Sequence, residues 1–239
     1  MIDHVTIRVS DRAASERFYA TVLRTLGIEQ TAGDEWDDFS FAATDAEHPV
    51  TRGLHIAWAA PSREHVQAFW QAGVDAGYRD DGAPGPRPQY GDDYYGGFLL
   101  DPDGNSAEAV HFDGQDRPLA IDHLWIRVAD TAAAKAFYAT IAPHAGLRLG
   151  DDKPERVQFR AQVGSFSLIP GGRRTEHLHL AFKAGDDATV DAFHAAATGA
   201  GYADNGGPGE RSKYHPGYYS AFVVDPDGHN VEVVNHNRG

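Results

Sequence analysis

The sequence predicts an α+β fold made of two tandem domains, and three observations support this prediction. The chain has 239 residues, which is enough for two domains of ordinary size. The same motifs occur twice, in the same order. Within each copy, stretches with the two-residue period of a strand alternate with stretches that have the period of a helix.

The repeat begins in the first residues of the chain. Ile2-Asp3-His4 recurs 119 positions later as Ile121-Asp122-His123, and farther on Tyr94-Tyr95 recurs 124 positions later as Tyr218-Tyr219. A repeat of this length indicates a duplicated domain, not a solenoid. The polar stretch 113–118 is the expected boundary, so we expect domains at residues 1–116 and 117–239.

Both copies predict the same order of elements. In the first copy, a strand at residues 2–9 leads into a helix that Ser10 or Asp11 can cap. Short strands follow, and then a strand at residues 54–58 precedes a second amphipathic helix. A Gly- and Pro-rich loop is expected next, including 206–209 in the second copy, before a final hairpin. We therefore expect helices packed on one face of a sheet in each copy.

The final hairpin is the clearest motif of each copy. Its turn reads Asp101-Pro102-Asp103-Gly104 in the first copy and Asp225-Pro226-Asp227-Gly228 in the second. Asp at the first position, Pro at the second and Gly at the fourth suit a type I turn. Apolar runs flank both turns, so the returning strands carry Glu108 and Glu232.

Composition narrows the class of partner. A formal net charge of −14 argues against nucleic-acid binding, because phosphates would be repelled. No run is long enough to span a membrane, and the N-terminus shows no secretory signal. The absence of cysteine excludes disulfides and thiolate ligands and fits a reducing compartment. We expect a cytoplasmic protein with a small-molecule partner, without nucleic-acid or membrane binding.

Side-chain alternation places six metal-ligating residues on strand faces opposite the helices. A lone His or Glu in a strand is usually structural, but these positions recur in register in the two copies: His4, His55 and Glu108, then His123, His179 and Glu232. Two imidazoles and a carboxylate suit a divalent metal such as Fe²⁺, Mn²⁺, Zn²⁺ or Ni²⁺, and they leave positions open for a chelating substrate. The triads can form within each copy, or across copies so that His4 meets His179 and Glu232.

Three further residues are candidates for catalysis. His215 lies in the loop before the second hairpin and could act as a general base, although its counterpart in the first copy is Gly91. Tyr95 and Tyr219 could donate a hydrogen bond to a chelated oxygen, with packing as the alternative role. His177 is expected at the rim of the site, and the remaining histidines, including His236, show no register and receive no role.

Together, these motifs resemble the vicinal oxygen chelate superfamily. The resemblance rests on Ile-Asp-His in the first strand, Phe-Tyr in the first helix, and Asp-Pro-Asp-Gly-x-x-x-Glu in the last hairpin. That superfamily includes glyoxalase I, bleomycin-resistance proteins, fosfomycin-resistance thiol transferases and type I extradiol dioxygenases. The resemblance implies paired βαβββ modules that form a cupped mixed β-sheet with helices on the outer face. It also implies that the six residues named above bind a divalent metal.

This sequence departs from individual members of the superfamily, and these departures narrow the range of reactions that we expect. Glyoxalase I adds a glutamate ligand, but the nearest stretches, 39–41 and 166–168, carry no carboxylate. Extradiol dioxygenases have a tyrosine where this chain has Phe98 and Phe222, while His215 lies near the place of their histidine. Bleomycin-resistance proteins generally lack the metal ligands.

We therefore expect a metal-dependent enzyme that acts on a small, oxygen-rich, chelating substrate. Dioxygenase-like chemistry ranks ahead of isomerase, lyase or thiol-transferase chemistry. The alternative is a drug- or metabolite-binding resistance protein without turnover. Two domains in one chain resemble a fused dimer, so we expect a monomer or a homodimer.

Overall fold

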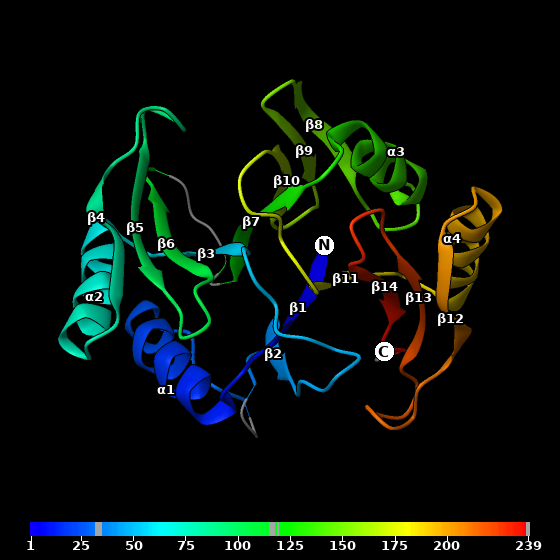
Figure 1. Cartoon of the computed structure of the whole chain (residues 1–239), viewed down its shortest axis with the longest axis horizontal. Helices are drawn as coiled ribbons and strands as arrows, with labels where there is room; N and C mark the ends of the chain where they lie inside the picture. Colours follow the sequence, from blue (N-terminus) through cyan, green and yellow to red (C-terminus); the bar gives the residue numbers. More distant parts are fainter. Residues whose placement is uncertain (32–34, 115–117, 119, 238–239) are drawn as a thin grey trace. The chain divides into compact units, whose positions relative to one another are not determined.

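The computed structural model describes residues 1–31, 35–114, 118 and 120–237 (Figure 1). Its helices are α1 (Arg12–Leu23), α2 (Arg63–Asp75), α3 (Thr131–Ile141) and α4 (Asp187–Gly199), with a 3₁₀ helix at Arg24–Leu26. The strands are β1 (Ile2–Arg8), β2 (Phe39–Ala42), β3 (His55–Ala59), β4 (Arg79–Pro86), β5 (Tyr94–Leu100), β6 (Ser106–Phe112), β7 (Ile121–Val128), β8 (Arg148–Lys153), β9 (Arg156–Arg160), β10 (Ser165–Pro170), β11 (His179–Lys183), β12 (Ala203–Glu210), β13 (Tyr219–Val224) and β14 (Asn230–Asn235). The expected boundary between residues 116 and 117 lies outside the described residues.

The chain divides into two compact units, and the division falls inside strands β1 and β7. Unit 1 comprises Met1–Thr6 and Ile126–Gly239, and unit 2 comprises Ile7–Trp125. The first strand of each sequence copy is therefore split, so that Asp3 and His4 belong to unit 1 whereas Asp122 and His123 belong to unit 2.

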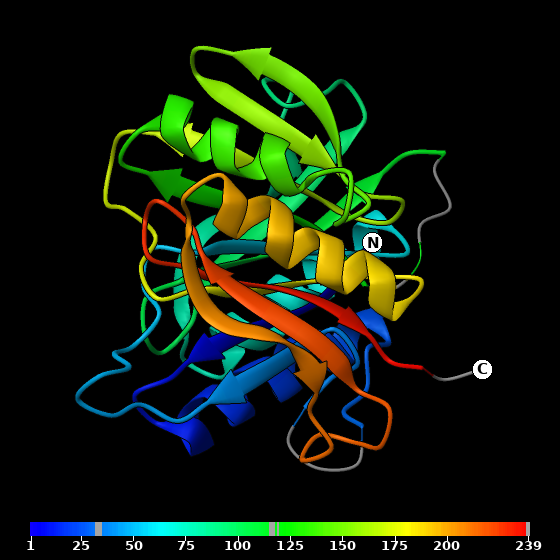
Figure 2. The same cartoon turned by 90° about the vertical axis from the view of Figure 1, so that its right-hand side faces the viewer.

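In unit 1, the strands that carry site residues follow the order β12-β13-β14-β11-β1. Strand β11 pairs in parallel with β14 and antiparallel with β1, so the sheet is mixed. Helix α4 lies along β12, β13 and β14 on one face of these strands (Figure 2). Helix α3 packs on α4, β9 and β10.

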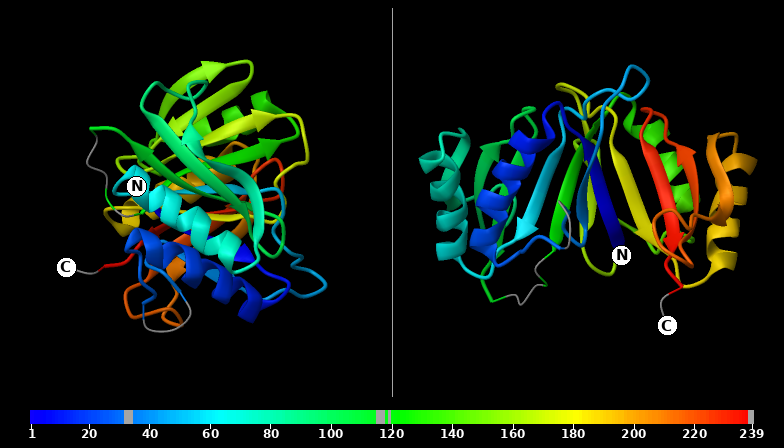
Figure 3. Two further views of the ribbon diagram at one scale, coloured as in Figure 1. Left: turned by 90° about the vertical axis from the view of Figure 1, so that its left-hand side faces the viewer. Right: turned by 90° about the horizontal axis from the view of Figure 1, so that it is seen from below.

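Unit 2 repeats this arrangement with the order β4-β5-β6-β3-β7. Strand β3 pairs in parallel with β6 and antiparallel with β7. Helix α2 packs on β4, β5 and β6, and α1 packs beside α2 (Figure 3). Among the described residues the strands form two mixed sheets, of six and eight strands, which confirms the predicted α+β fold.

Residues of the repeated turn and of the first helix hold the final hairpin in place. In unit 2, Gly104 N donates to Asp101 O (3.0 Å), which closes the predicted turn, and Gly104 has φ +85°. The buried Asp101 carboxylate accepts hydrogen bonds from the backbone N–H of Asp103 and Asn105 and from the Tyr19 hydroxyl (2.9 Å). Burial raises the pKa of Asp101. The motif thus fixes the start of β6, which carries Glu108.

The Gly- and Pro-rich segments predicted as loops are strands, so that prediction was wrong. Strands β4 and β12 pair antiparallel with β5 and β13, with register shifts at Gly82 and Gly206. Each lies at the outer end of its strand order, where a proline need not donate to a neighbour. Bulges accommodate the glycines with positive φ.

No helix among the described residues is long and apolar enough to cross a membrane.

Candidate metal centres

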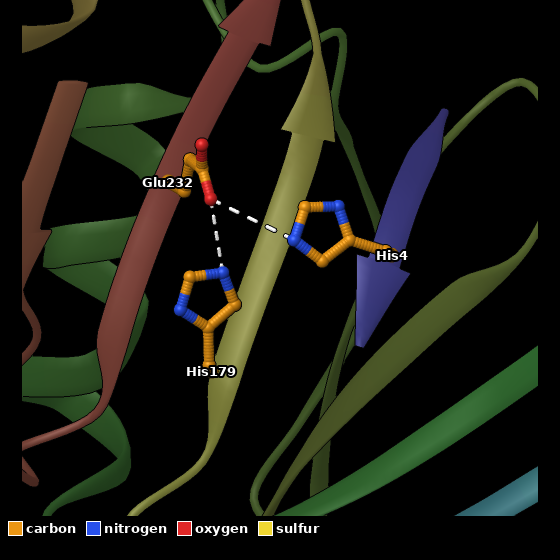
Figure 4. Close-up of side chains that lie close together, drawn as sticks. All are labelled: His4, His179 and Glu232. Carbon is orange, nitrogen blue, oxygen red and sulfur yellow. Dashed lines mark hydrogen bonds and ion pairs between the residues drawn. The ribbon is translucent and has the colours of Figure 1, made fainter. Parts of the chain in front are cut away.

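Three of the predicted ligands converge in unit 1. His4 on β1, His179 on β11 and Glu232 on β14 point toward one another across adjacent strands (Figure 4). Glu232 Oε2 lies 3.0 Å from His179 Nε2 and 3.7 Å from His4 Nε2. We call this cluster the His4 site.

The other three predicted ligands converge in unit 2. His55 on β3, Glu108 on β6 and His123 on β7 again come from adjacent strands. Glu108 Oε2 lies 2.9 Å from His55 Nε2 and 3.4 Å from His123 Nε2. We call this cluster the His123 site.

The ligands therefore group across the sequence copies. The sequence left two groupings open, and the structure has the one in which His4 meets His179 and Glu232. The division of the chain within β1 and β7 is the reason, because it places His4 and His123 each in the unit of the other copy's hairpin.

The distances in both sites suit a bound divalent metal. Two ligand atoms that each lie about 2.1 Å from a metal, at right angles, are about 3 Å apart. In the His4 and His123 sites, the candidate ligand atoms all lie within 4.8 Å of one another, and three of the four histidine–glutamate separations are 3.4 Å or less. The donor set of two histidines and one carboxylate is also the one that leaves coordination positions open.

The outward-facing nitrogens of two ligands are held by aspartates. His4 Nδ1 lies 2.8 Å from Asp3 Oδ2, and His123 Nδ1 lies 2.8 Å from Asp122 Oδ1. A carboxylate at Nδ1 keeps the proton on that nitrogen and leaves Nε2 free to bind a metal.

The other two histidines have polar but uncharged neighbours at Nδ1. His55 Nδ1 lies 3.2 Å from Ser106 Oγ, and His179 Nδ1 lies 2.5 Å from the side-chain amide of Asn230. All four rings thus turn Nε2 toward a glutamate. At Nδ1, His4, His55 and His123 face an oxygen that can accept a proton, as metal-ligating histidines do, whereas His179 faces the amide nitrogen of Asn230.

Two aspartates in this arrangement were not among the predicted site residues. Strict alternation would turn Asp3 and Asp122 away from His4 and His123. A register shift opposite each pair, between Ile2 and His4 in β1 and between Ala57 and Trp58 opposite β7, disturbs that alternation. A bulge re-aims a side chain in this way, and the repeated Ile-Asp-His motif was the available signal.

A tyrosine hydroxyl fixes each glutamate. Tyr94 donates to Glu108 Oε1 (2.6 Å), and Tyr218 donates to Glu232 Oε1 (2.8 Å). Burial and the nearby carboxylate raise the pKa of both tyrosines, so both stay protonated. Because Oε1 is engaged, Oε2 is the oxygen that faces the histidines.

Tyr95 and Tyr219, the two tyrosines predicted for the site, lie on the helix side of their strands instead. Gln67 Nε2 donates to the Tyr95 hydroxyl (3.1 Å), and the Tyr219 hydroxyl donates to Asp191 (2.9 Å). Gln67 is on α2 and Asp191 is on α4. Alternation along the strand sends adjacent side chains to opposite faces, so the prediction chose the wrong member of each Tyr-Tyr pair.

In the His123 site, the histidines and carboxylates stabilise one another's charges against the effect of burial. Burial alone would raise the pKa of Glu108, but His123 and His55 outweigh it and lower the pKa to about 2. Burial likewise opposes a charge on His123, but Asp122 and Glu108 raise its pKa to about 9. In the His4 site, His179 and His4 lower the pKa of Glu232 against the effect of burial. Without a metal, each carboxylate is therefore held ionised beside its imidazoles.

His215 lies close to residues that surround the ligands of the His4 site. Its ring packs edge-on against Tyr218, with 5.2 Å between ring centroids. His215 Nε2 lies 2.9 Å from Nδ1 of His236, a residue without a predicted role. His236 follows Glu232 at an even spacing on β14 and its extension, which is the signal that could have identified it.

Comparison with known proteins supports the family and the fold. Residues 1–109 match the model of the Glyoxalase/Bleomycin resistance protein/Dioxygenase superfamily. Among solved structures, the V278E mutant of glyoxalase I from Zea mays is 19% identical, with TM-score 0.69 over 98% of this chain and 92% of that chain. A candidate dioxygenase from Bacillus subtilis subsp. subtilis str. 168 is 16% identical, with TM-score 0.67 over 100% of this chain and 86% of that chain. No curated protein sequence matches the chain.

At these identities the solved structures show a shared fold alone. The family match covers the first copy, and the second copy repeats its motifs, its elements and its three candidate ligands. The predicted resemblance is thus confirmed for the first copy, whose residues 1–109 match the model of the Glyoxalase/Bleomycin resistance protein/Dioxygenase superfamily.

Proposed function

We propose that this chain is a metal-dependent enzyme whose His4 and His123 sites each hold a divalent metal. The observation that carries the proposal is the convergence of two imidazole Nε2 atoms and one carboxylate Oε2 in each unit. The proposed substrate is a small molecule with two neighbouring oxygens, which would chelate the metal at its open positions. The metal would supply Lewis-acid chemistry or, if it is iron, would bind dioxygen.

The residues of the chain would prepare each site before substrate arrives. Asp3 and Asp122 hold His4 and His123 in the tautomer that leaves Nε2 free. Tyr94 and Tyr218 hold the glutamates so that one oxygen faces the histidines. Glu108 and Glu232 are buried, with 0% and 1% of their surface exposed. Because they are shielded from water, their charges would interact strongly with a bound cation.

Within the superfamily, we propose dioxygenase-like chemistry with Fe²⁺. Two histidines and one carboxylate with open positions are typical of non-haem iron oxygenases. The absence of a carboxylate from stretches 39–41 and 166–168 disfavours the glutamate-assisted isomerisation of glyoxalase I. Mn²⁺, Zn²⁺ or Ni²⁺ with lyase, isomerase or thiol-transferase chemistry is the alternative within the same sites.

The duplication supports further parts of the proposal. We propose that residues 1–116 and 117–239 are two copies of one ancestral domain. Such a fused pair needs no second chain to form both sites, because each triad lies within one unit. A cytoplasmic monomer is therefore our first expectation, with a homodimer as the alternative.

Dioxygen consumption tests the proposed reaction. We expect the Fe²⁺-loaded chain to consume dioxygen when a diol such as catechol is added, and we expect the double variant Glu108→Gln/Glu232→Gln not to do so. A matched double variant, Tyr95→Phe/Tyr219→Phe, changes only hydroxyls on the helix side and should keep the activity.

A second candidate function is binding of a drug or metabolite without turnover. It predicts that ligand binding survives Glu108→Gln and Glu232→Gln, because an apolar cup would not need the metal. Binding that persists in both variants, together with no dioxygen consumption, would replace the enzyme proposal.

A further inference from the structure

An indole ring borders the ligands of the His123 site. The centroid of the Trp125 ring lies 5.1 Å from that of His55 and 6.3 Å from that of His123. The first contact follows from the backbone register, because Trp125 and His55 are directly paired across β7 and β3. Trp125 is only partly buried, so its ring keeps surface that a ligand can contact.

A second ring reaches the same site from the loop between β4 and β5. Tyr90 packs against Trp125, with 5.1 Å between ring centroids, and against Tyr94, with 5.2 Å. Tyr94 is on β5 and Trp125 is on β7, and between them lie β6 and β3, which carry two of the ligands. A ring that contacts both must lie over these two strands. We call Tyr90 and Trp125 the aromatic wall of the His123 site.

The His4 site has a threonine where the His123 site has this tryptophan. Thr6 follows His4 by two residues, as Trp125 follows His123. Thr6 is also paired with His179 across β1 and β11, which is the pairing that Trp125 has with His55 in unit 2. The two residues therefore occupy matching places beside the two sites.

The loop tyrosine responds to this difference. Tyr214 in unit 1 is the counterpart of Tyr90, 124 positions later, and its ring packs against Tyr218 with 4.8 Å between centroids. A threonine at position 6 offers Tyr214 no second ring. Accordingly, 56% of Tyr214 is exposed, compared with 41% of Tyr90. The aromatic wall is thus a feature of the His123 site that duplication did not give to the His4 site.

A wall of this kind distinguishes planar ligands from saturated ones of similar size. Aromatic rings attract one another in offset or edge-on arrangements with centroids about 4.5–7 Å apart, and the contact stabilises beyond the area that it buries. A planar substituent on a chelating ligand can make such contacts with Trp125 and Tyr90. The methyl and hydroxyl groups of Thr6 offer no equivalent.

We propose that Trp125 and Tyr90 are specificity-determining residues, and that the His123 site prefers oxygen chelators that carry a planar ring. This inference rests on the proposed metal sites, because the ring reaches the wall only when its oxygens are held beside the three ligands. The His4 site, with Thr6, does not distinguish planar from saturated substituents in this way. One chain therefore accepts two kinds of substrate from the same chelating class.

Hydroxamate binding to Zn²⁺-loaded protein tests this preference. Benzohydroxamate and cyclohexanecarbohydroxamate have the same chelating group, and they differ in whether their six-membered ring is planar. Glu232→Gln retains only the His123 site and Glu108→Gln retains only the His4 site, so calorimetry gives the Kd of each compound at each site. At the His123 site we expect benzohydroxamate to bind about fivefold more tightly than the saturated compound, which is the size of an aromatic contact. At the His4 site we expect similar affinities.

Variants of the wall separate specificity from damage to the ligands. In the Glu232→Gln background, Trp125→Thr should abolish the preference and leave the Kd of the saturated compound nearly unchanged, whereas Trp125→Phe keeps a ring and should keep most of the preference. In the Glu108→Gln background, Thr6→Trp should create a preference. If Trp125→Thr does not fold, Tyr90→Ala changes a more exposed ring and should reduce the preference in the same way.

Equal ratios of the two dissociation constants in the two single-site proteins would overturn the inference. A preference that survives both Trp125→Thr and Tyr90→Ala would also overturn it. Elemental analysis of the same samples identifies a failure of the metal sites themselves, since absence of bound Zn²⁺ would refute those sites and the inference with them.

Discussion

The hydroxyl of Tyr94 donates a 2.6 Å hydrogen bond to Oε1 of Glu108. That bond orients a buried carboxylate from outside the set of three ligands. Removal of such a supporting contact typically lowers metal affinity by about 10- to 100-fold.

Tyr94→Phe should therefore weaken metal binding at the His123 site by about tenfold, because Glu108 loses the donor that fixes it. Competition with a chromogenic chelator measures the affinity. The neighbouring variant Tyr95→Phe is the control, since that hydroxyl contacts Gln67 on α2. An equal loss in both variants would show that general destabilisation, not orientation of Glu108, is responsible.

Metal content per chain should be two equivalents after loading, because each unit holds one triad. Glu108→Gln and Glu232→Gln should each bind one equivalent, and the double variant should bind none. Elemental analysis of dialysed protein measures the content. If either single variant lost both metals, the two sites would not be independent.

The glycine at position 96 should be required for metal binding at the His123 site. A Cβ at this position would overlap Glu108 Oε1 and approach the Tyr94 ring. We expect Gly96→Ala to displace the glutamate and reduce bound metal from two equivalents to about one. The second copy has Ser220 at the matching position, so Ser220→Gly is a control that should keep both metals. Retention of two metals in Gly96→Ala would mean that the strand shifts to make room.

The stability of the metal-free protein and its affinity for metal should change with pH in opposite directions. In the metal-free protein, Asp122 and Glu108 raise the pKa of His123 from 6.5 to about 9, against the effect of burial. A histidine whose pKa is raised on folding contributes its full stabilisation below the pKa of the unfolded state. That contribution is lost as the pH rises through the pKa of the folded state. We therefore expect the free energy of unfolding of the metal-free protein to fall between about pH 6.5 and pH 9.

Metal affinity should instead rise over the same range, because ligation requires neutral histidine. Urea unfolding and metal competition at a series of pH values measure the two trends. In His123→Asn, the part of this pH dependence of stability that His123 contributes should be absent. A metal-free protein whose stability does not change from pH 6.5 to pH 9 would contradict the ion pair between His123 and Glu108.

The six candidate ligands could be predicted because two simple patterns identify them. Alternation along a strand gives the face of His55 or Glu108, and the Asp-Pro-Asp-Gly turn marks where the last strand begins. The grouping could not be predicted in the same way. Whether His4 joins Glu108 or Glu232 depends on which hairpin its strand reaches, and the strands of both copies carry the same Ile-Asp-His motif.

The errors also have local physical causes. Tyr95 was chosen over Tyr94 because a pair of identical residues gives no sign of which one faces the site. Asp3 was missed because a bulge disturbs the alternation on which the prediction depended. Strands β4 and β12 were missed because glycine and proline usually end strands, yet a bulged edge strand accommodates them.

The division of the chain within β1 and β7 has a consequence for the order of events during synthesis. The ribosome makes His4 long before its partner Glu232. Unit 2, by contrast, can complete its own triad as soon as His123 has left the ribosome. The two sites would therefore mature at different times, and the His4 site cannot form until β14 has been made.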